Sequence, residues 1–327
     1  MKKLGKIVMT GKPMPEADAW IRERCEVMSW DEPGVMPRPL LLEWLADADG
    51  LMSVGGQPVK VDAELLAHAP KLRVIAQSSV GYDNVDVAAC TASGVPFGNT
   101  PGVLTEATAD LTYLLVLSAA RRLKESVAIV QEGRWTPTSP IPLGVDLFGK
   151  TLGMVGLGQI GSAVARRAMA SGMNVIYYNR HRRSPQEENG AIYVGFAELL
   201  AQADFIVVLV PLNEDSRGLF GAAEFTKMKK TAFFINAARG AIVKTEELYA
   251  AVREGVIAGC ALDVTDPEPI PADHPLLQLP NVFVTPHIGS ATLETRNRMA
   301  MLAAENLILG LERKPLKTCV NADINYR

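Results

Sequence analysis

His287, Arg239 and Glu268 are the residues of this sequence best suited to transferring a proton beside a bound anion. Each ends or closely follows an apolar run; the runs are VFVTPH, TAFFINAA and GCALDV respectively. If these runs are strands of one parallel sheet, the side chains meet at its carboxyl edge, where such sheets bind ligands. The guanidinium would hold a carboxylate and polarise a carbonyl, while the imidazolium would donate a proton. The carboxylate would fix the imidazole tautomer and favour its protonated form. This set suits the reduction of a 2-oxo acid.

Each of these residues also has a simpler interpretation. A lone histidine is more often structural than catalytic, Arg239 alone suits a helix cap or the surface, and Glu268 alone suits a loop. The remaining histidines are weaker candidates for a general acid. His68 stands in a helical pattern, His181 in a basic cluster and His274 in a loop. The agreement of three strand ends is what favours a site.

A glycine-rich stretch, GLGQIG (156–161), follows one apolar run and opens a helical pattern. In that context Gly156 permits a tight turn, Gly158 lets the backbone approach a pyrophosphate, and Gly161 lets helix and strand pack closely. The start of the helix presents unpaired N–H groups to the phosphates. The alternative is a plain strand-to-helix turn, but the context favours a dinucleotide. The predicted binding loop also contains Leu157, Gln159 and Ile160.

The next predicted strand ends at Asn179, where a dinucleotide fold that selects NAD usually carries an acidic residue. A carboxylate would repel a 2′-phosphate, whereas a neutral amide does not. Arg180, Arg182 and Arg183 follow, and a guanidinium can pair with a phosphate through two hydrogen bonds and stack on adenine. The alternative is a solvated basic loop. The position at a strand end favours NADPH, bound by Asn179 and Arg180 with Arg182 or Arg183 assisting.

The elements that must position these residues are β-branched apolar runs alternating with helical patterns, which predicts an α/β fold with parallel strands. A first series of strands is predicted at 6–11, 25–30, 50–54 and 73–79. A second series is predicted at 151–156, 173–179, 205–210, 231–238, 259–264 and 282–287. Several of these runs are apolar on both faces, as in strands covered by helices on each side.

The pattern predicts two doubly wound domains, the second inserted in the first. One helical pattern, 103–133, is long enough to bridge them, and another, 292–313, closes the chain. Periodicity alone does not prove the insertion.

Composition narrows the classes of protein. The 327 residues suffice for two domains, and 48% hydrophobic with 21% charged residues is typical of a globular protein. A net charge of −3 gives no reason to expect binding to nucleic acid or to an anionic membrane. The four cysteines are far apart and form no metal or redox motif, so we expect buried free thiols and no metal site. No signal peptide is recognisable at the N-terminus, which predicts a cytoplasmic protein.

Several segments resemble the D-isomer-specific 2-hydroxyacid dehydrogenase family, and the resemblance runs along nearly the whole chain. Within that family, the chain is most similar to the bacterial glyoxylate/hydroxypyruvate reductase group, whose members also reduce 2-ketogluconate. The matching segments are SSVGYDNVD (78–86), GNTPGVLTEATADLT (98–112), GLGQIG, INAARGAIV (235–243), ALDVTDPEP (261–269) and TPHIGSAT (285–292).

The resemblance implies roles for residues. It makes Arg239 the substrate-binding arginine, Glu268 the partner of histidine and His287 the proton donor in reduction to a D-2-hydroxy acid. It places the substrate carboxylate at the backbone of Val80 and Gly81. Near the nicotinamide it places Thr108, the segment Ala237, Ala238 and Arg239, and Asp263. Gly289 is a further residue that it assigns to cofactor binding.

The resemblance also implies an architecture, with a substrate domain at 1–101 and 289–327 and a Rossmann coenzyme domain at 102–288. It implies a homodimer joined through the coenzyme domain, with 103–133 in the contact.

Two alternatives stay open. One is an NAD-dependent D-glycerate or D-lactate type of dehydrogenase, which Asn179 and Arg180 disfavour. The other is a dinucleotide-sensing protein such as the corepressors that share this fold, because a fold does not by itself imply turnover.

Overall fold

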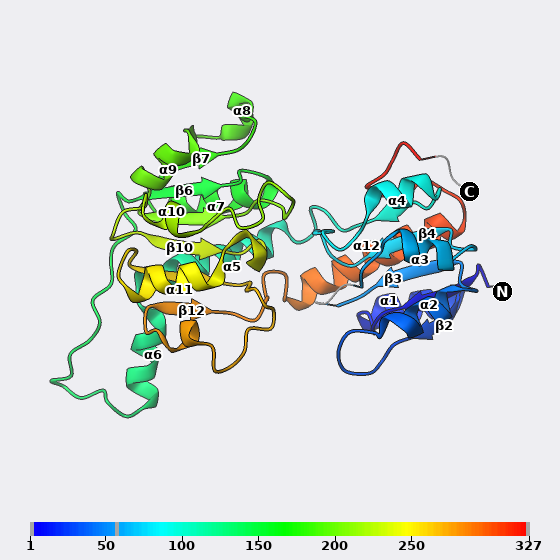
Figure 1. Ribbon diagram of the computed structural model, residues 1–327, viewed down its shortest axis with the longest axis horizontal. Coiled ribbons are helices and arrows are strands. Elements are labelled where there is room, and N and C mark those ends of the chain that lie inside the picture. Colours follow the sequence, from blue (N-terminus) through cyan, green and yellow to red (C-terminus); the bar gives the residue numbers. More distant parts are fainter. Residues whose placement is uncertain (1–2, 56–58, 325–327) are drawn as a thin grey trace. The chain divides into compact units, whose positions relative to one another are not determined.

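The computed structural model describes residues 3–55 and 59–324, which form two compact units. One unit combines the chain up to Leu104 with the chain from Ser290 onward, and the other is the continuous segment Thr105–Gly289 (Figure 1). The changeovers lie three residues and one residue after the boundaries predicted from the sequence. The second unit is therefore inserted in the first.

The first unit is built on a five-stranded parallel sheet in the order β2-β1-β3-β4-β5. Its strands are β1 (Lys6–Met9), β2 (Glu26–Ser29), β3 (Gly50–Ser53), β4 (Val74–Gln77) and β5 (Phe97–Gly98). Its helices are α1 (Pro15–Arg24), α2 (Arg38–Leu45), α3 (Ala63–His68), α4 (Val87–Ala92) and α12 (Leu293–Leu311).

Helices cover both faces of this sheet. Ile7 and Met9 of β1 pack in a core with α1 and α12, whereas Val8 packs with α2 and α3 on the opposite face. Helix α12 lies so close to the sheet that a Cβ added at Gly310 would stand 2.4 Å from the side chain of Val74. Residues from the end of the chain thus complete a core that the first residues begin.

The second unit is built on a seven-stranded parallel sheet in the order β12-β11-β10-β9-β6-β7-β8. Its strands are β6 (Thr151–Val155), β7 (Asn174–Tyr178), β8 (Ile192–Tyr193), β9 (Phe205–Val208), β10 (Phe233–Asn236), β11 (Gly259–Leu262) and β12 (Val282–Val284). Its α-helices are α5 (Thr105–Ala120), α6 (Leu123–Gln131), α7 (Gln159–Ala170), α8 (Pro185–Glu188), α9 (Phe196–Gln202), α10 (Ala222–Phe225) and α11 (Thr245–Arg253). Two 3₁₀ turns, η1 (Gly240–Ile242) and η2 (Pro275–Gln278), complete it.

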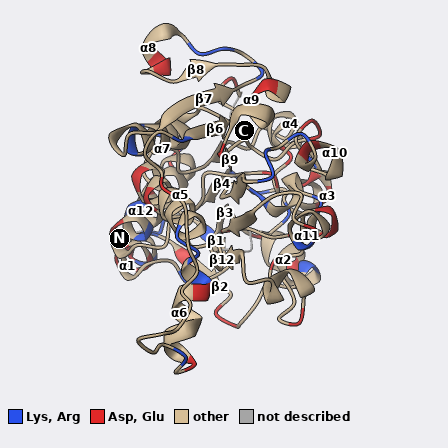
Figure 2. Ribbon diagram, turned by 90° about the vertical axis from the view of Figure 1, so that its left-hand side faces the viewer, with Lys and Arg blue, Asp and Glu red and all other residues tan. Residues whose placement is uncertain are grey.

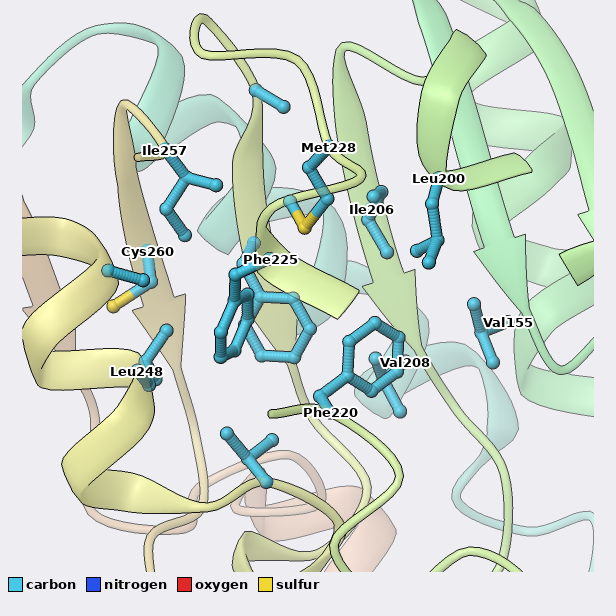
Figure 3. Close-up of a cluster of buried hydrophobic side chains, with 14 of the residues drawn as sticks. Val155, Leu200, Ile206, Val208, Phe220, Phe225, Met228, Leu248, Ile257 and Cys260 are labelled. Atoms are coloured by element: carbon cyan, nitrogen blue, oxygen red, sulfur yellow. The ribbon is translucent and has the colours of Figure 1, made fainter. Parts of the chain in front are cut away.

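Each face of the second sheet carries its own apolar core. One face packs the aromatic rings of Phe220, Phe225 and Phe234 among aliphatic side chains, with ring centroids 4.9–6.3 Å apart (Figure 3). The other face packs α5 and α7 around Tyr177 and neighbouring strand residues. Fully buried strands of this kind hold their carboxyl ends in fixed positions, which a site at that edge requires.

The predicted strands and the doubly wound α/β class are confirmed, with strand ends a few residues shorter than predicted. The sequence patterns missed the two-residue strands β5 and β8. None of the helices in the described ranges is long and apolar enough to cross a membrane.

The long helical pattern over 103–133 forms two helices, α5 and α6, and not one. The chain breaks at Arg122, whose φ of 49° is left-handed, and separate helices α5 and α6 lie on either side. The carbonyl of Ala120 accepts a hydrogen bond of 2.8 Å from Val145 N. A continuing helix would need that carbonyl for residue 124, so the returning segment ends α5.

Candidate active site

The three residues proposed for chemistry follow neighbouring strands of the second unit. Arg239 comes after β10, Glu268 after β11 and His287 after β12, and these strands are adjacent in the sheet. Because all three strands are parallel, the segments leave from the same edge. The predicted convergence of strand ends is therefore found in the fold.

His287 and Glu268 are in direct contact. The imidazole Nδ1 lies 2.6 Å from the Glu268 Oε1, and Glu268 Oε2 accepts from the backbone N of Thr265 at 3.3 Å. Burial would raise the pKa of the Glu268 carboxyl, but the hydrogen bond to His287 and the charges of His287 and Arg239 outweigh it and hold that pKa below its usual value. With Nδ1 engaged by a carboxylate, Nε2 is the ring nitrogen that can face a substrate.

The backbone of His287 is left-handed, with φ of 53°, and a buried aspartate holds it there. Its N–H donates to the carbonyl of Asp263 at 2.9 Å. The Asp263 side chain, in a residue only 2% exposed, accepts from Thr285 Oγ1 at 2.7 Å, Ile288 N at 2.8 Å and Gly289 N at 2.9 Å. Burial raises the pKa of Asp263 despite these donors. A left-handed histidine costs about 1–2 kcal/mol, so Asp263 acts as a clamp for this turn.

Thr108 and Gly289 lie beside Asp263. A Cβ added at Gly289 would stand 3.2 Å from Asp263 Oδ2 and 3.3 Å from Thr108 Cγ2. The structure therefore brings together three of the residues that the resemblance assigns to cofactor binding, next to the turn that carries His287.

The turn that carries Arg239 is fixed by a buried asparagine. Asn236, 1% exposed at the end of β10, donates from Nδ2 to the Arg239 carbonyl at 2.8 Å and accepts from Ala238 N at 3.0 Å. The next residue, Gly240, lies against the loop of Glu268, because an added Cβ would stand 1.9 Å from the Thr265 carbonyl oxygen. Sequence reasoning missed Asn236; the available signal was a polar residue at the end of an apolar strand.

The glycine loop has the geometry of a phosphate cradle. Gly156 has φ of 106°, and a Cβ there would stand 2.8 Å from the Leu209 backbone. A Cβ at Gly161 would stand 2.2 Å from the Gly156 carbonyl, so helix α7 and strand β6 approach closely. At Gly158, the N-cap of α7, nothing lies within 4 Å of an added Cβ. The first N–H groups of α7 and this open space fit a pyrophosphate.

Asn179 joins the glycine loop directly, since its Oδ1 accepts from Leu157 N at 2.8 Å. The basic residues that follow appear as the blue stretch beside α8 and β8 in Figure 2. Arg180 pairs with Asp215 at 2.7 Å, Arg182 with Glu188 at 2.7 Å and Arg183 with Glu187 at 3.2 Å. Sequence reasoning did not foresee these acidic partners.

Val80 and Gly81 belong to the first unit, in the loop after β4. The Gly81 carbonyl accepts from Gln77 Nε2 at 2.7 Å and from Ser79 Oγ at 2.8 Å, and the Val80 carbonyl accepts from Asn99 Nδ2 at 2.9 Å. Side chains thus hold the loop by hydrogen bonds to its backbone carbonyl oxygens. This arrangement is compatible with backbone N–H groups of the loop binding an anion.

A parallel sheet with a glycine loop after β6 and a histidine–glutamate pair at the same edge is typical of dinucleotide-dependent dehydrogenases. The family model of the D-isomer specific 2-hydroxyacid dehydrogenase, NAD binding domain, matches residues 113–289. The chain belongs to this family, as the resemblance in the sequence indicated, and is an NAD(P)-dependent oxidoreductase.

Individual relatives cover most of the chain. A glyoxylate reductase from Korarchaeum cryptofilum is 45% identical over 88% of this chain and 87% of its own. A glyoxylate/hydroxypyruvate reductase B from Klebsiella pneumoniae is 47% identical over 86% and 87%. An NADPH-dependent glyoxylate/hydroxypyruvate reductase from Sinorhizobium meliloti, solved with NADP and malonate, is 31% identical with a TM-score of 0.86, covering 98% of both chains.

Proposed function

We propose that this enzyme reduces small 2-oxo acids, glyoxylate and hydroxypyruvate first and 2-ketogluconate as a further candidate, to D-2-hydroxy acids with NADPH as the preferred cofactor. The observation that carries the proposal is the 2.6 Å contact between His287 and Glu268 at the sheet edge that also carries Arg239. Relatives named as glyoxylate reductase and glyoxylate/hydroxypyruvate reductase support the substrate class.

In this proposal each residue of the site has a separate role in the reduction. Bound NADPH supplies the hydride that reaches the carbonyl carbon. Arg239 holds the carboxylate and polarises the ketone. His287 gives the proton on Nε2 to the carbonyl oxygen, so that one hydride and one proton make the alcohol. Glu268 keeps the imidazole in the required tautomer and stabilises its positive charge.

Initial rates with purified protein test this function. We expect turnover of glyoxylate and hydroxypyruvate, with kcat/KM for NADPH above that for NADH. A preference for NADH with D-lactate or D-glycerate oxidation would favour the NAD-dependent alternative. Dinucleotide binding without turnover of any of the three acids would favour the corepressor-like alternative.

Glu268→Gln tests the acid–base pair through pH. Glutamine takes away the negative charge that faces the imidazole and so removes a partner of its positively charged form. We expect the alkaline fall of the reduction rate to move to lower pH, and oxidation of the hydroxy acid to extend to lower pH. The control is Glu246→Gln, which removes the carboxylate 3.2 Å from His274. Unmoved profiles in both directions would contradict the pairing.

The double change Asn179→Asp and Arg180→Ser tests the cofactor choice. Aspartate keeps the acceptor for Leu157 N and adds a charge that repels a 2′-phosphate, while the second change removes a phosphate partner. We expect the ratio of kcat/KM for NADPH to that for NADH to fall about ten- to a hundredfold. Arg253→Ser, at an exposed arginine of α11, should leave the ratio in place. An unchanged ratio in the double variant would contradict the assignment.

We also propose that two copies associate through the second unit. Ten of the fifteen exposed large apolar residues in the described chain lie between 114 and 148, on α5, α6 and the segment that follows; they include Trp135, Leu143 and Phe148, each at least 70% exposed. So many exposed apolar side chains on one stretch of the chain suit an isologous contact with a second copy. A monomer in sedimentation velocity at micromolar concentration would contradict it.

A further inference from the structure

The three arginines after β7 have acidic partners in two different places. Arg182 and Arg183 pair with Glu188 and Glu187 of α8, the helix that follows them directly. Glu188 is only 11% exposed in its side chain and also accepts from Tyr177 Oη at 2.7 Å, so it is part of a fixed network. Arg180 differs from both, since its partner Asp215 belongs to the loop after β9.

The Arg180–Asp215 pair crosses the candidate cofactor site. Strand β6, which leads into the glycine loop, lies between β7 and β9 in the sheet. The pair therefore joins the loops on either side of the strand that carries the cradle. Its Nη1 and Oδ2 atoms are 2.7 Å apart, and the two side chains are 63% and 73% exposed.

The loop that carries Asp215 is locally fixed. Ser216, 7% exposed, donates from Oγ to the Pro211 carbonyl at 2.7 Å and accepts from Asn213 N at 2.9 Å. Its own N–H donates to Asn213 Oδ1 at 3.0 Å. Asp215 is thus presented from a structured turn, on the side of β6 opposite to Asn179.

We propose that Asp215 is a specificity-determining residue of the cofactor site, one that competes with the 2′-phosphate of NADPH for Arg180. The inference rests on the proposed binding of the adenosine end beside Asn179 and Arg180. Bound NADPH offers Arg180 a phosphate with more charge than a carboxylate, so the guanidinium changes partner and leaves Asp215 unpaired near that phosphate. NADH lacks the phosphate, so the pair persists. Asp215 therefore weakens the binding of NADPH and leaves that of NADH unchanged.

Asp215→Asn tests this competition, because asparagine keeps the size of the side chain and removes its charge. Dissociation constants are measured by fluorescence titration for NADPH and NADH, and by calorimetry for 2′-phospho-AMP and AMP, which lack the nicotinamide. Exposed ion pairs contribute little, so we expect the variant to bind NADPH and 2′-phospho-AMP about two- to fivefold more tightly. NADH and AMP should bind as before. The gain should shrink at high salt, where the wild-type pair is screened.

Two further variants make the result decisive. Glu254→Gln removes an exposed pair with Arg253 that is also 2.7 Å long but lies at the C-terminal end of α11, and it should change the affinity for neither cofactor. In an Arg180→Gln background, Asp215→Asn should lose most of its effect, because the guanidinium for which Asp215 and the phosphate compete is absent. An equal gain for both cofactors, an unchanged affinity for NADPH, or a full effect without Arg180 would each overturn the inference.

The same data separate this inference from the proposed function. The wild-type ratio of the two cofactor affinities tests the NADPH preference, whereas the change of that ratio in Asp215→Asn tests the competition. A wild type that prefers NADH but gains NADPH affinity in the variant would refute the preference and keep the role of Asp215. A wild type that prefers NADPH, with no change of the affinity ratio in the variant, would keep the preference and refute the role of Asp215.

Discussion

Replacement of His287 by asparagine is expected to lower kcat for glyoxylate or hydroxypyruvate reduction about 10²–10⁴-fold, the usual contribution of a positioned general acid. Asparagine is the sharper choice than alanine, because it tolerates the left-handed backbone that the histidine adopts. The substitution should slow the proton transfer and leave cofactor binding intact, so NADPH should bind with nearly its normal dissociation constant. His287→Ala should lose as much activity, with some loss of stability from the strained backbone.

Steady-state rates, cofactor titration and thermal unfolding of both variants separate these effects. The control is His68→Ala, at an exposed histidine of α3, which should keep full activity. Turnover near that of the wild type in the asparagine variant would remove His287 from the mechanism.

Arg239→Ala is expected to lower kcat/KM about 10²–10³-fold, since the guanidinium both holds the carboxylate and stabilises charge that develops on the ketone oxygen. The double role predicts a rise in KM together with a fall in kcat. Arg239→Lys keeps the charge but loses the planar fork of donors, so it should recover only part of the activity. Arg253→Ala serves as the control.

An increase in KM alone, with kcat intact, would mean that Arg239 binds the substrate without polarising it. Normal kinetics in Arg239→Ala would exclude both roles.

Much of the fold was predictable because buried parallel strands have a strong local signal. Runs such as FIVVLV and TAFFINAA are apolar on both faces, and they form β9 and β10. The break at Arg122 was not predictable, because the atom that ends α5 is the N–H of Val145, a residue distant in sequence. Periodicity describes one segment at a time and cannot reveal such a contact.

The candidate site divides in the same way. His287 and Glu268 were predictable as a pair because each follows a strand end, and the structure brings them into contact. The residues that hold the turn of Arg239 and the loop of Val80 and Gly81 were not predictable, because Asn236 and Gln77 act through hydrogen bonds to backbone atoms of a folded loop. Asp215 lies 35 residues from Arg180, so their pairing depends on the order of strands in the sheet.

The discontinuous first unit has a consequence for biosynthesis. The ribosome delivers β1, β3 and β4 early, but α12, which covers one face of them, comes last. The whole second unit is a continuous segment with its own cores. It is synthesised after these strands and before α12, and it can fold independently of the first unit. Through most of translation this sheet face therefore has only α1 to cover it, and the apolar surface that α12 will bury is open to chaperones.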